Sequence, residues 1–141
     1  MADASGAGRP APITAPLSEP FWEGTRNGEL RLQRCGSCSR FVWTPQYACP
    51  DCLSEDYEWV ACSGRGVVYS YTVVHRSIDP SRFEAPYVLA VVQLEEGPHL
   101  LTNIVGCEPE AVQVDMPVEV RFERIDDEFT VYPFAPREVQ E

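Results

Sequence analysis

The chain has 141 residues, a net charge of −11 and eleven basic residues that are all arginine. Such an acidic surface repels phosphate backbones and argues against nucleic acid as a partner, while the absence of lysine excludes a Schiff base on the chain itself. No run of about 18 apolar residues and no charged-then-apolar leader is present, so we expect no membrane span, no secretory signal and a cytoplasmic location.

The N-terminal part divides into a tail and a short helix. Residues 1–16 are small residues and prolines without periodicity, which predicts a disordered tail. We expect a helix within residues 17–29, with Ser18 as the N-cap and glycines that end it early. This helix carries Phe21 and Trp22, which either pack on the protein's own sheet or contact a partner, since aromatic residues are enriched in interface cores.

Residues 30–62 contain the strongest chemical signal, two C-x-x-C pairs separated by ten residues. Two such knuckles facing each other supply four thiolates in a tetrahedron, the geometry that Zn²⁺ prefers in structural sites. The spacing therefore predicts a zinc ribbon whose ligands are Cys35, Cys38, Cys49 and Cys52. Two disulfides, buried free thiols, or iron at the same four sulfurs are the alternatives.

The remaining cysteines lie outside this spacing. Cys62 and Cys107 are expected to be ordinary small residues and not ligands. Residues 30–34 alternate and predict the first strand of the ribbon, and the aromatic residues of the 39–48 spacer give the module a small core. A module this small needs its metal to fold, because its apolar burial alone is insufficient.

From residue 63 to 141 the pattern becomes that of strands. Turn signals and one long connection, 106–116, separate five strand-like segments: 67–78, 86–94, 99–105, 118–123 and 129–134. Five strands with a long connection before the fourth favour a Greek-key barrel of the OB type, although other small β-barrels and sandwiches remain possible. The expected fold is mainly β: a short N-terminal helix, a rubredoxin-like zinc ribbon and a five-stranded OB-type barrel.

The sequence offers little for catalysis. A closed four-sulfur site has no open coordination position with which to activate water or a carbonyl group. His75 and His99 lie far apart in the sequence, and neither belongs to a nucleophile–base motif. We therefore predict no catalytic residue and expect a chain that is not an enzyme on its own.

Several segments together resemble a known family. They are PFWEG at 20–24, GEL at 28–30, QRC at 33–35, the two knuckles, GRGVVYSYTV at 64–73 and MPVEV at 116–120. Over residues 17–135 the chain is similar to the acyl-CoA-associated proteins that join a rubredoxin-like zinc ribbon to an OB fold. The resemblance implies an accessory subunit of a thiolase-superfamily enzyme that forms or cleaves carbon–carbon bonds, for example in lipid or steroid side-chain breakdown. Some relatives are also associated with hot-dog-fold hydratases.

In such assemblies the partner carries the catalytic residues, while this subunit stabilises it or helps to hold the CoA thioester. Arg65, Arg76 and Arg82 are the candidate CoA phosphate contacts, since guanidinium pairs well with phosphate; solvated surface charge is their alternative role. Gln46 and Asp115 depart from the arginine and the glycine that are frequent in the family. The first departure removes a candidate phosphate contact, and Asp tolerates the left-handed conformation that glycine adopts.

Three other functions remain open at this stage. Zinc ribbons and OB folds both bind nucleic acid elsewhere, although the charge argues against it here. Iron at the four sulfurs would make a rubredoxin-like electron carrier. An independent acyl-CoA hydrolase is disfavoured because the chain lacks a catalytic constellation. The polar loop at 77–85 is a candidate lid or partner contact.

Overall fold

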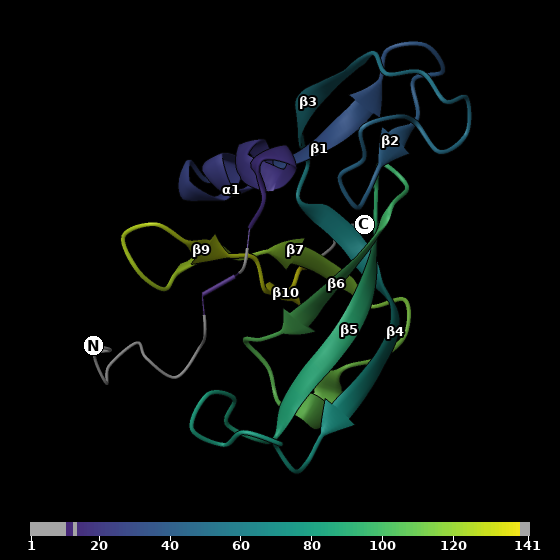
Figure 1. Cartoon of the computed structure of the whole chain (residues 1–141). Coiled ribbons are helices and arrows are strands. Elements are labelled where there is room, and N and C mark those ends of the chain that lie inside the picture. The colour runs from purple at the N-terminus through teal and green to yellow at the C-terminus, as the bar shows by residue number, and fades with distance from the viewer. Residues whose placement is uncertain (1–10, 13, 139–141) are drawn as a thin grey trace.

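The computed structural model describes residues 11–12 and 14–138, which form a short helix, a three-stranded ribbon and a closed five-stranded barrel. Residues 1–10 and 13 of the expected tail lie outside the described residues. Figure 1 shows the helix and the ribbon at one end of the molecule and the barrel at the other. This architecture confirms the expected mainly β fold.

The helix is preceded by a 3-10 turn, η1, at Pro16–Ser18 and spans Glu19–Arg26 as α1. Ser18 stands at the N-cap position as expected, but its hydroxyl donates back to the Ala15 carbonyl at 3.0 Å and does not cap the helix. The helix ends where Gly28 adopts a φ of 76°, a left-handed value that glycine reaches without strain. Among the described residues, no helix is long and apolar enough to cross a membrane.

The ribbon is an antiparallel sheet with the order β2-β1-β3. Its strands are β1 at Leu30–Cys35, β2 at Phe41–Val42 and β3 at Tyr57–Cys62. The sequence pattern predicted β1 but not β3, which pairs with β1 over its full length. Residues of β3 are half-buried on both faces, so the strand lacks the clean alternation that identifies a strand with one buried face.

The barrel has the strand order β10-β6-β5-β4-β7 and is closed. The pair β6 and β10 is parallel and the other pairs are antiparallel, as an OB-type Greek key requires. A bulge between Val68 and Ser70 interrupts the register of β4 and β5. The strands are β4 at Arg65–Val74, β5 at Tyr87–Leu94, β6 at His99–Ile104, β7 at Pro117–Val120 and β10 at Phe134–Pro136, and η2 at Pro109–Ala111 lies in the long connection.

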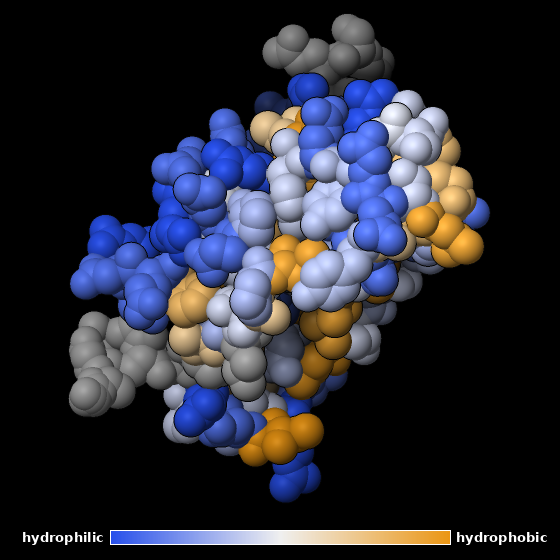
Figure 2. Space-filling view, turned by 45° about the horizontal axis from the view of Figure 1, so that its top comes forward, coloured by the Kyte–Doolittle hydropathy of each residue, from blue (hydrophilic) through white to orange (hydrophobic). Residues whose placement is uncertain are grey.

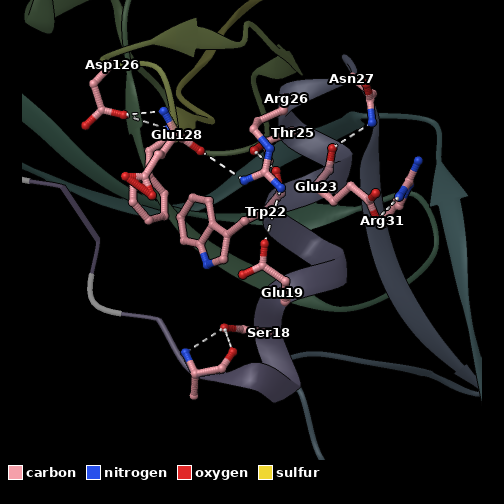
Figure 3. Close-up of polar contacts among 12 residues, drawn as sticks. Ser18, Glu19, Trp22, Glu23, Thr25, Arg26, Asn27, Arg31, Asp126 and Glu128 are labelled. Atoms are coloured by element: carbon pink, nitrogen blue, oxygen red, sulfur yellow. Dashed lines mark hydrogen bonds and ion pairs between the residues drawn. The ribbon is translucent and has the colours of Figure 1, made fainter.

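The last two strands expected from the sequence, 118–123 and 129–134, are each divided in the structure. The inner end of each lies in a separate hairpin outside the barrel, formed by β8 at Glu123–Arg124 and β9 at Thr130–Val131. The Asp126 carboxylate closes its turn by accepting the N–H groups of Glu128 and Phe129 at 2.8 and 2.7 Å. The Arg26 guanidinium of α1 donates to the Glu128 carbonyl at 2.9 Å, as Figure 3 shows. The hairpin that leaves the barrel thus contacts the helix.

One hydrophobic core joins the barrel to the ribbon and the helix. The barrel interior is built from the alternate, inward-facing residues of its strands, and it continues into Phe21, Leu30 and Leu32, which are 1%, 1% and 0% exposed. The Phe21 ring lies 4.7 Å from Trp43 of the ribbon and 5.3 Å from Tyr132 beside the barrel, measured between ring centroids. The helix therefore packs over the place where the ribbon sheet meets the barrel.

Only Ser63 and Gly64 separate β3 of the ribbon from β4 of the barrel. The Ser63 N–H donates to the Glu96 carboxylate at 2.8 Å, and the Gly64 carbonyl accepts the Val120 N–H at 2.8 Å. Both linker residues are thus hydrogen-bonded to the barrel. The domain division at 62/63 that the sequence predicted falls within this connection and stays a prediction.

Candidate metal centre and exposed barrel face

The two C-x-x-C knuckles have the same backbone geometry. In the first, the Ser39 N–H donates to the Cys35 carbonyl at 3.0 Å; in the second, the Leu53 N–H donates to the Cys49 carbonyl at 2.8 Å. Ser39 and Leu53 both adopt left-handed φ values, 67° and 64°. The matching turns place four sulfurs in one cluster, all within 4.8 Å of one another: Cys35, Cys38, Cys49 and Cys52.

This cluster fits a tetrahedral metal ion. Zinc–sulfur bonds of about 2.3 Å in a tetrahedron place neighbouring sulfurs about 3.8 Å apart. The Cys35–Cys52 and Cys38–Cys49 sulfur distances are 3.5 and 3.7 Å. Such separations exceed the length of a disulfide bond, and all four cysteines are free. The geometry of the four cysteines therefore suits a metal ion, and their assignment as its ligands stays a prediction.

Backbone N–H groups stabilise thiolates in both knuckles. The pKa of Cys35 is lowered to about 6, chiefly by the hydrogen bond from the Cys38 N–H and then by that from the Ser37 N–H. The pKa of Cys49 is lowered chiefly by the Cys52 N–H. For Cys38 the largest influence, the N–H of Arg40, also lowers the pKa, but burial and the neighbouring thiols together raise it to about 12.

Side chains outside the cluster hold the two knuckles together. Arg40, which follows the first knuckle, forms an ion pair with Asp51 inside the second. The hydroxyl groups of Ser37, in the first knuckle, and Ser54, just after the second, are hydrogen-bonded at 2.9 Å and link the two knuckles as well.

The spacer between the knuckles is fixed from β1. The buried Gln33 amide accepts the Gln46 N–H at 2.8 Å and donates to its carbonyl at 2.8 Å. Position 46 thus contributes its backbone to the ribbon while its side chain stays exposed. The other departure from the family pattern, Asp115, has a φ of 70°, and its N–H donates to the Val68 carbonyl at 2.7 Å, so the aspartate occupies the left-handed conformation that the glycine would take.

The three candidate CoA-binding arginines do not form one site. Arg65 begins β4, whereas Arg76 and Arg82 lie in the loop beyond the other end of the β4–β5 ladder. At about 3.3 Å per residue this ladder separates the two groups by roughly 25 Å. Arg65 pairs with Glu95 at 3.6 Å and Arg82 pairs with Asp79 at 3.4 Å, so each of these charges is partly neutralised.

The two aromatic residues of α1 have different surroundings. Phe21 is 1% exposed. Of the two roles expected for this side chain, the structure shows packing on the protein's own residues and not contact with a partner. Trp22 is half-buried and packs edge-on against Phe129 of the hairpin, with ring centroids 5.7 Å apart. Trp22 also lines an open, mainly apolar groove of about 330 Å³, together with Phe83, Leu89, Leu101, Tyr132 and neighbouring residues.

This groove adjoins a surface that the sequence interpretation did not single out. Leu89, Val91 and Leu101 point outward from β5 and β6, and Val91 and Leu101 are paired across the ladder. Leu101 is 57% exposed. The signal was available in the sequence: 86–94 is almost continuously apolar, although a barrel strand with one solvent-facing side should alternate with polar residues. Figure 2 shows hydrophobic residues gathered in a stripe beside a mainly hydrophilic surface.

The histidines and the two other cysteines lie away from the four-sulfur cluster. His75 follows β4 in a bend, and His99 begins β6 with its ring 4.3 Å from that of Tyr69. Burial raises the pKa of Cys62 to about 12. Cys107 also has a raised pKa because of burial. Both thiols are protonated at neutral pH, in keeping with their expected role as ordinary small residues.

A four-cysteine ribbon that runs directly into a closed five-stranded barrel defines the class of proteins that join a rubredoxin-like zinc ribbon to an OB fold. Two family descriptions match in succession: "ChsH2, rubredoxin-like zinc ribbon domain" over residues 22–58 and "ChsH2, C-terminal OB-fold domain" over residues 59–123. The chain belongs to this ChsH2 family.

The similar proteins include an aldolase structure and subunits named for enzymes that act on CoA compounds. The solved structure named "Ltp2-ChsH2(DUF35) aldolase" superposes with a TM-score of 0.82 at 37% identity, over 89% of this chain and 98% of that chain. A "Probable enoyl-CoA hydratase alpha subunit" of Thermomonospora curvata is 41% identical over 122 residues, 86% of this chain and 38% of that protein. "Benzoylsuccinyl-CoA thiolase subunit BbsA" of Geobacter metallireducens is 31% identical over 91 residues, 64% of this chain and 60% of that protein. The chain therefore spans less than two thirds of both these relatives.

Proposed function

We propose that the chain is an accessory subunit of a thiolase-like enzyme that acts on acyl-CoA thioesters in lipid or steroid side-chain breakdown. The observation that carries this proposal is its membership of a family whose named relatives are subunits of thiolase, aldolase and hydratase enzymes. The chemistry of the chain supports it, because four cysteines around one ion leave no open position for a substrate. The catalytic residues then belong to the partner.

We further propose that the four-cysteine cluster holds structural Zn²⁺. The sulfur separations match a tetrahedral thiolate site, and the backbone N–H groups on Cys35 and Cys49 favour the ionised thiols that a metal needs. When bound, the ion cross-links the two knuckles. A cytoplasmic location is in keeping with this proposal, because a reducing compartment keeps paired cysteines available for metal. Metal analysis distinguishes zinc from iron, since an iron-loaded site of this type is red.

Binding of the CoA thioester is the finer part of the proposal. Arg76 and Arg82 share one loop and are the pair that can serve a common phosphate group, whereas Arg65 acts alone at the far end of the ladder. Guanidinium groups suit this role because they bind phosphate oxygens in a bidentate manner. A hot-dog-fold hydratase is a second proposed partner, in view of the hydratase subunit among the relatives.

The test is reconstitution. The tagged chain is purified from its host, and a thiolase-like protein should accompany it at a fixed ratio. That partner is then assayed for acyl-CoA turnover with and without the chain. We expect turnover or stability of the partner to depend on the chain, and the chain alone to turn over no thioester. Enzyme-like turnover by the isolated chain, or purification without any acyl-CoA enzyme, would contradict the proposal.

A further inference from the structure

The outward face of β5 and β6 combines exposed aliphatic side chains with an absence of charged ones. No outward position of either strand is aspartate, glutamate, lysine or arginine, although 23% of the chain is charged. Three of these positions are aliphatic: Leu89, Val91 and Leu101. We call this surface the β5–β6 face. Depletion of charge around exposed apolar side chains is the compositional mark of an interface core.

The apolar groove gives this face a place for an anchoring side chain. Leu89 and Leu101 belong both to the face and to the groove wall, so the two features form one continuous surface. The groove is also lined by Trp22 of α1 and Tyr132 after β9, which belong to other parts of the chain. Protein interfaces concentrate their binding energy in such pockets, where a partner's apolar side chain is fully desolvated.

Charge decides between the possible occupants. Acidic residues border the face, with Glu84 before β5 and Glu95 in the β5–β6 turn. Of the nearby arginines, Arg65 is paired with Glu95 and Arg82 with Asp79, and Arg76 lies in the same loop as Arg82, so Glu84 and the net charge of the whole chain are what give the border its acidic character. A second copy would bring the same acidic border and another net charge of −11 against it, which is repulsive. A complementary occupant presents an apolar patch with basic residues around it.

We infer that the β5–β6 face is the docking surface for the thiolase-like partner, which contacts it with an apolar patch bordered by lysine or arginine. This inference rests on the proposed accessory function and adds where the contact lies. The four-cysteine ribbon then lies outside the centre of the contact, and Leu53, exposed in its second knuckle, is not needed for docking.

The experiment uses the full chain and the thiolase-like protein that accompanies it from the host, purified separately. Binding is measured by calorimetry and size-exclusion chromatography for Leu101→Glu and Leu89→Glu. The matched control is Val114→Glu, because Val114 is 56% exposed and Leu101 is 57% exposed. Leu53→Glu tests the ribbon. Circular dichroism and metal content establish that each variant is folded.

We expect Leu101→Glu and Leu89→Glu to weaken binding by about 30-fold or more, as a charge at a hot spot does. Val114→Glu and Leu53→Glu should stay within about threefold of wild type. Wild-type affinity in Leu101→Glu, or an equal loss in a control variant, overturns the inference while the accessory function stands. A wild-type dimer that Leu101→Glu dissociates assigns the face to a second copy and also overturns it. Failure of the wild-type chain to bind any thiolase-like protein refutes the accessory function, and the inference with it.

Discussion

Replacement of Phe21 by alanine tests how the ribbon is held on the barrel. The side chain is 1% exposed and contacts aromatic rings from three parts of the chain: Trp22 of α1, Trp43 of the ribbon and Tyr132 beside the barrel. Because these neighbours are anchored in separate elements, they cannot collapse into the cavity that alanine would leave. The expected loss therefore lies in the middle of the range for a buried phenylalanine, about 4 kcal/mol.

A loss of this size lowers the folding equilibrium constant by roughly 1,000-fold and the melting temperature by about 10 to 15 °C. The measurement is guanidinium unfolding followed by circular dichroism at saturating zinc, so that metal binding contributes equally to every variant. Tyr47→Ala is the control, because Tyr47 is an aromatic residue of the ribbon that is 73% exposed and should cost less than about 0.5 kcal/mol. A loss below about 1.5 kcal/mol for Phe21→Ala would show that the helix does not clamp the two sheets together.

Three further predictions concern the backbone and the metal. Gly66→Ala should destabilise the barrel by about 2 kcal/mol or more in chemical unfolding, because a Cβ at this position meets the β5 backbone. Gly97→Ala is the control: its Cβ would point into open space, so only the left-handed φ is strained, at a cost of about 1 kcal/mol. Serine at any one of the four knuckle positions should lower bound metal to well below one ion per chain, while Cys62→Ser retains it; full occupancy in a knuckle variant contradicts the site. Metal binding at about pH 7.5 should release a proton from Cys38, with its pKa near 12, but none from Cys35, with its pKa near 6. Since Cys35 becomes protonated as the pH falls through 6, calorimetry in buffers of different ionisation enthalpy should find additional proton release at about pH 5; equal release at both pH values refutes the assignment.

The sequence predicted the features that depend on local chemistry. Two C-x-x-C turns close on themselves through their own backbone, so their spacing was sufficient to predict the metal-type cluster that the structure contains. The alternation of β7 and the apolar runs of β5 and β6 likewise predicted the strands of the barrel. Each of these signals lies within a few consecutive residues.

Features that depend on distant contacts were missed or misplaced. β3 is half-buried by neighbours on both sides, which hides its period, and the β8–β9 hairpin packs against α1, about a hundred residues earlier in the chain. For Phe21 the sequence left packing on the protein's own sheet and contact with a partner as alternatives, and its burial follows from the meeting of helix, ribbon and barrel. The sequence did not show that a long strand ladder separates Arg65 from Arg76 and Arg82, and a CoA contact by any of these arginines stays a prediction.

The two-residue connection between ribbon and barrel has a mechanical consequence. Ser63 and Gly64 are bonded to the barrel on both sides, and the ribbon strand passes into the barrel strand without a flexible hinge. A torque applied to the knuckles is therefore transmitted to the barrel wall. A protein that binds the ribbon therefore has the barrel at a fixed distance and angle, so the chain can set the spacing between two components of a larger assembly.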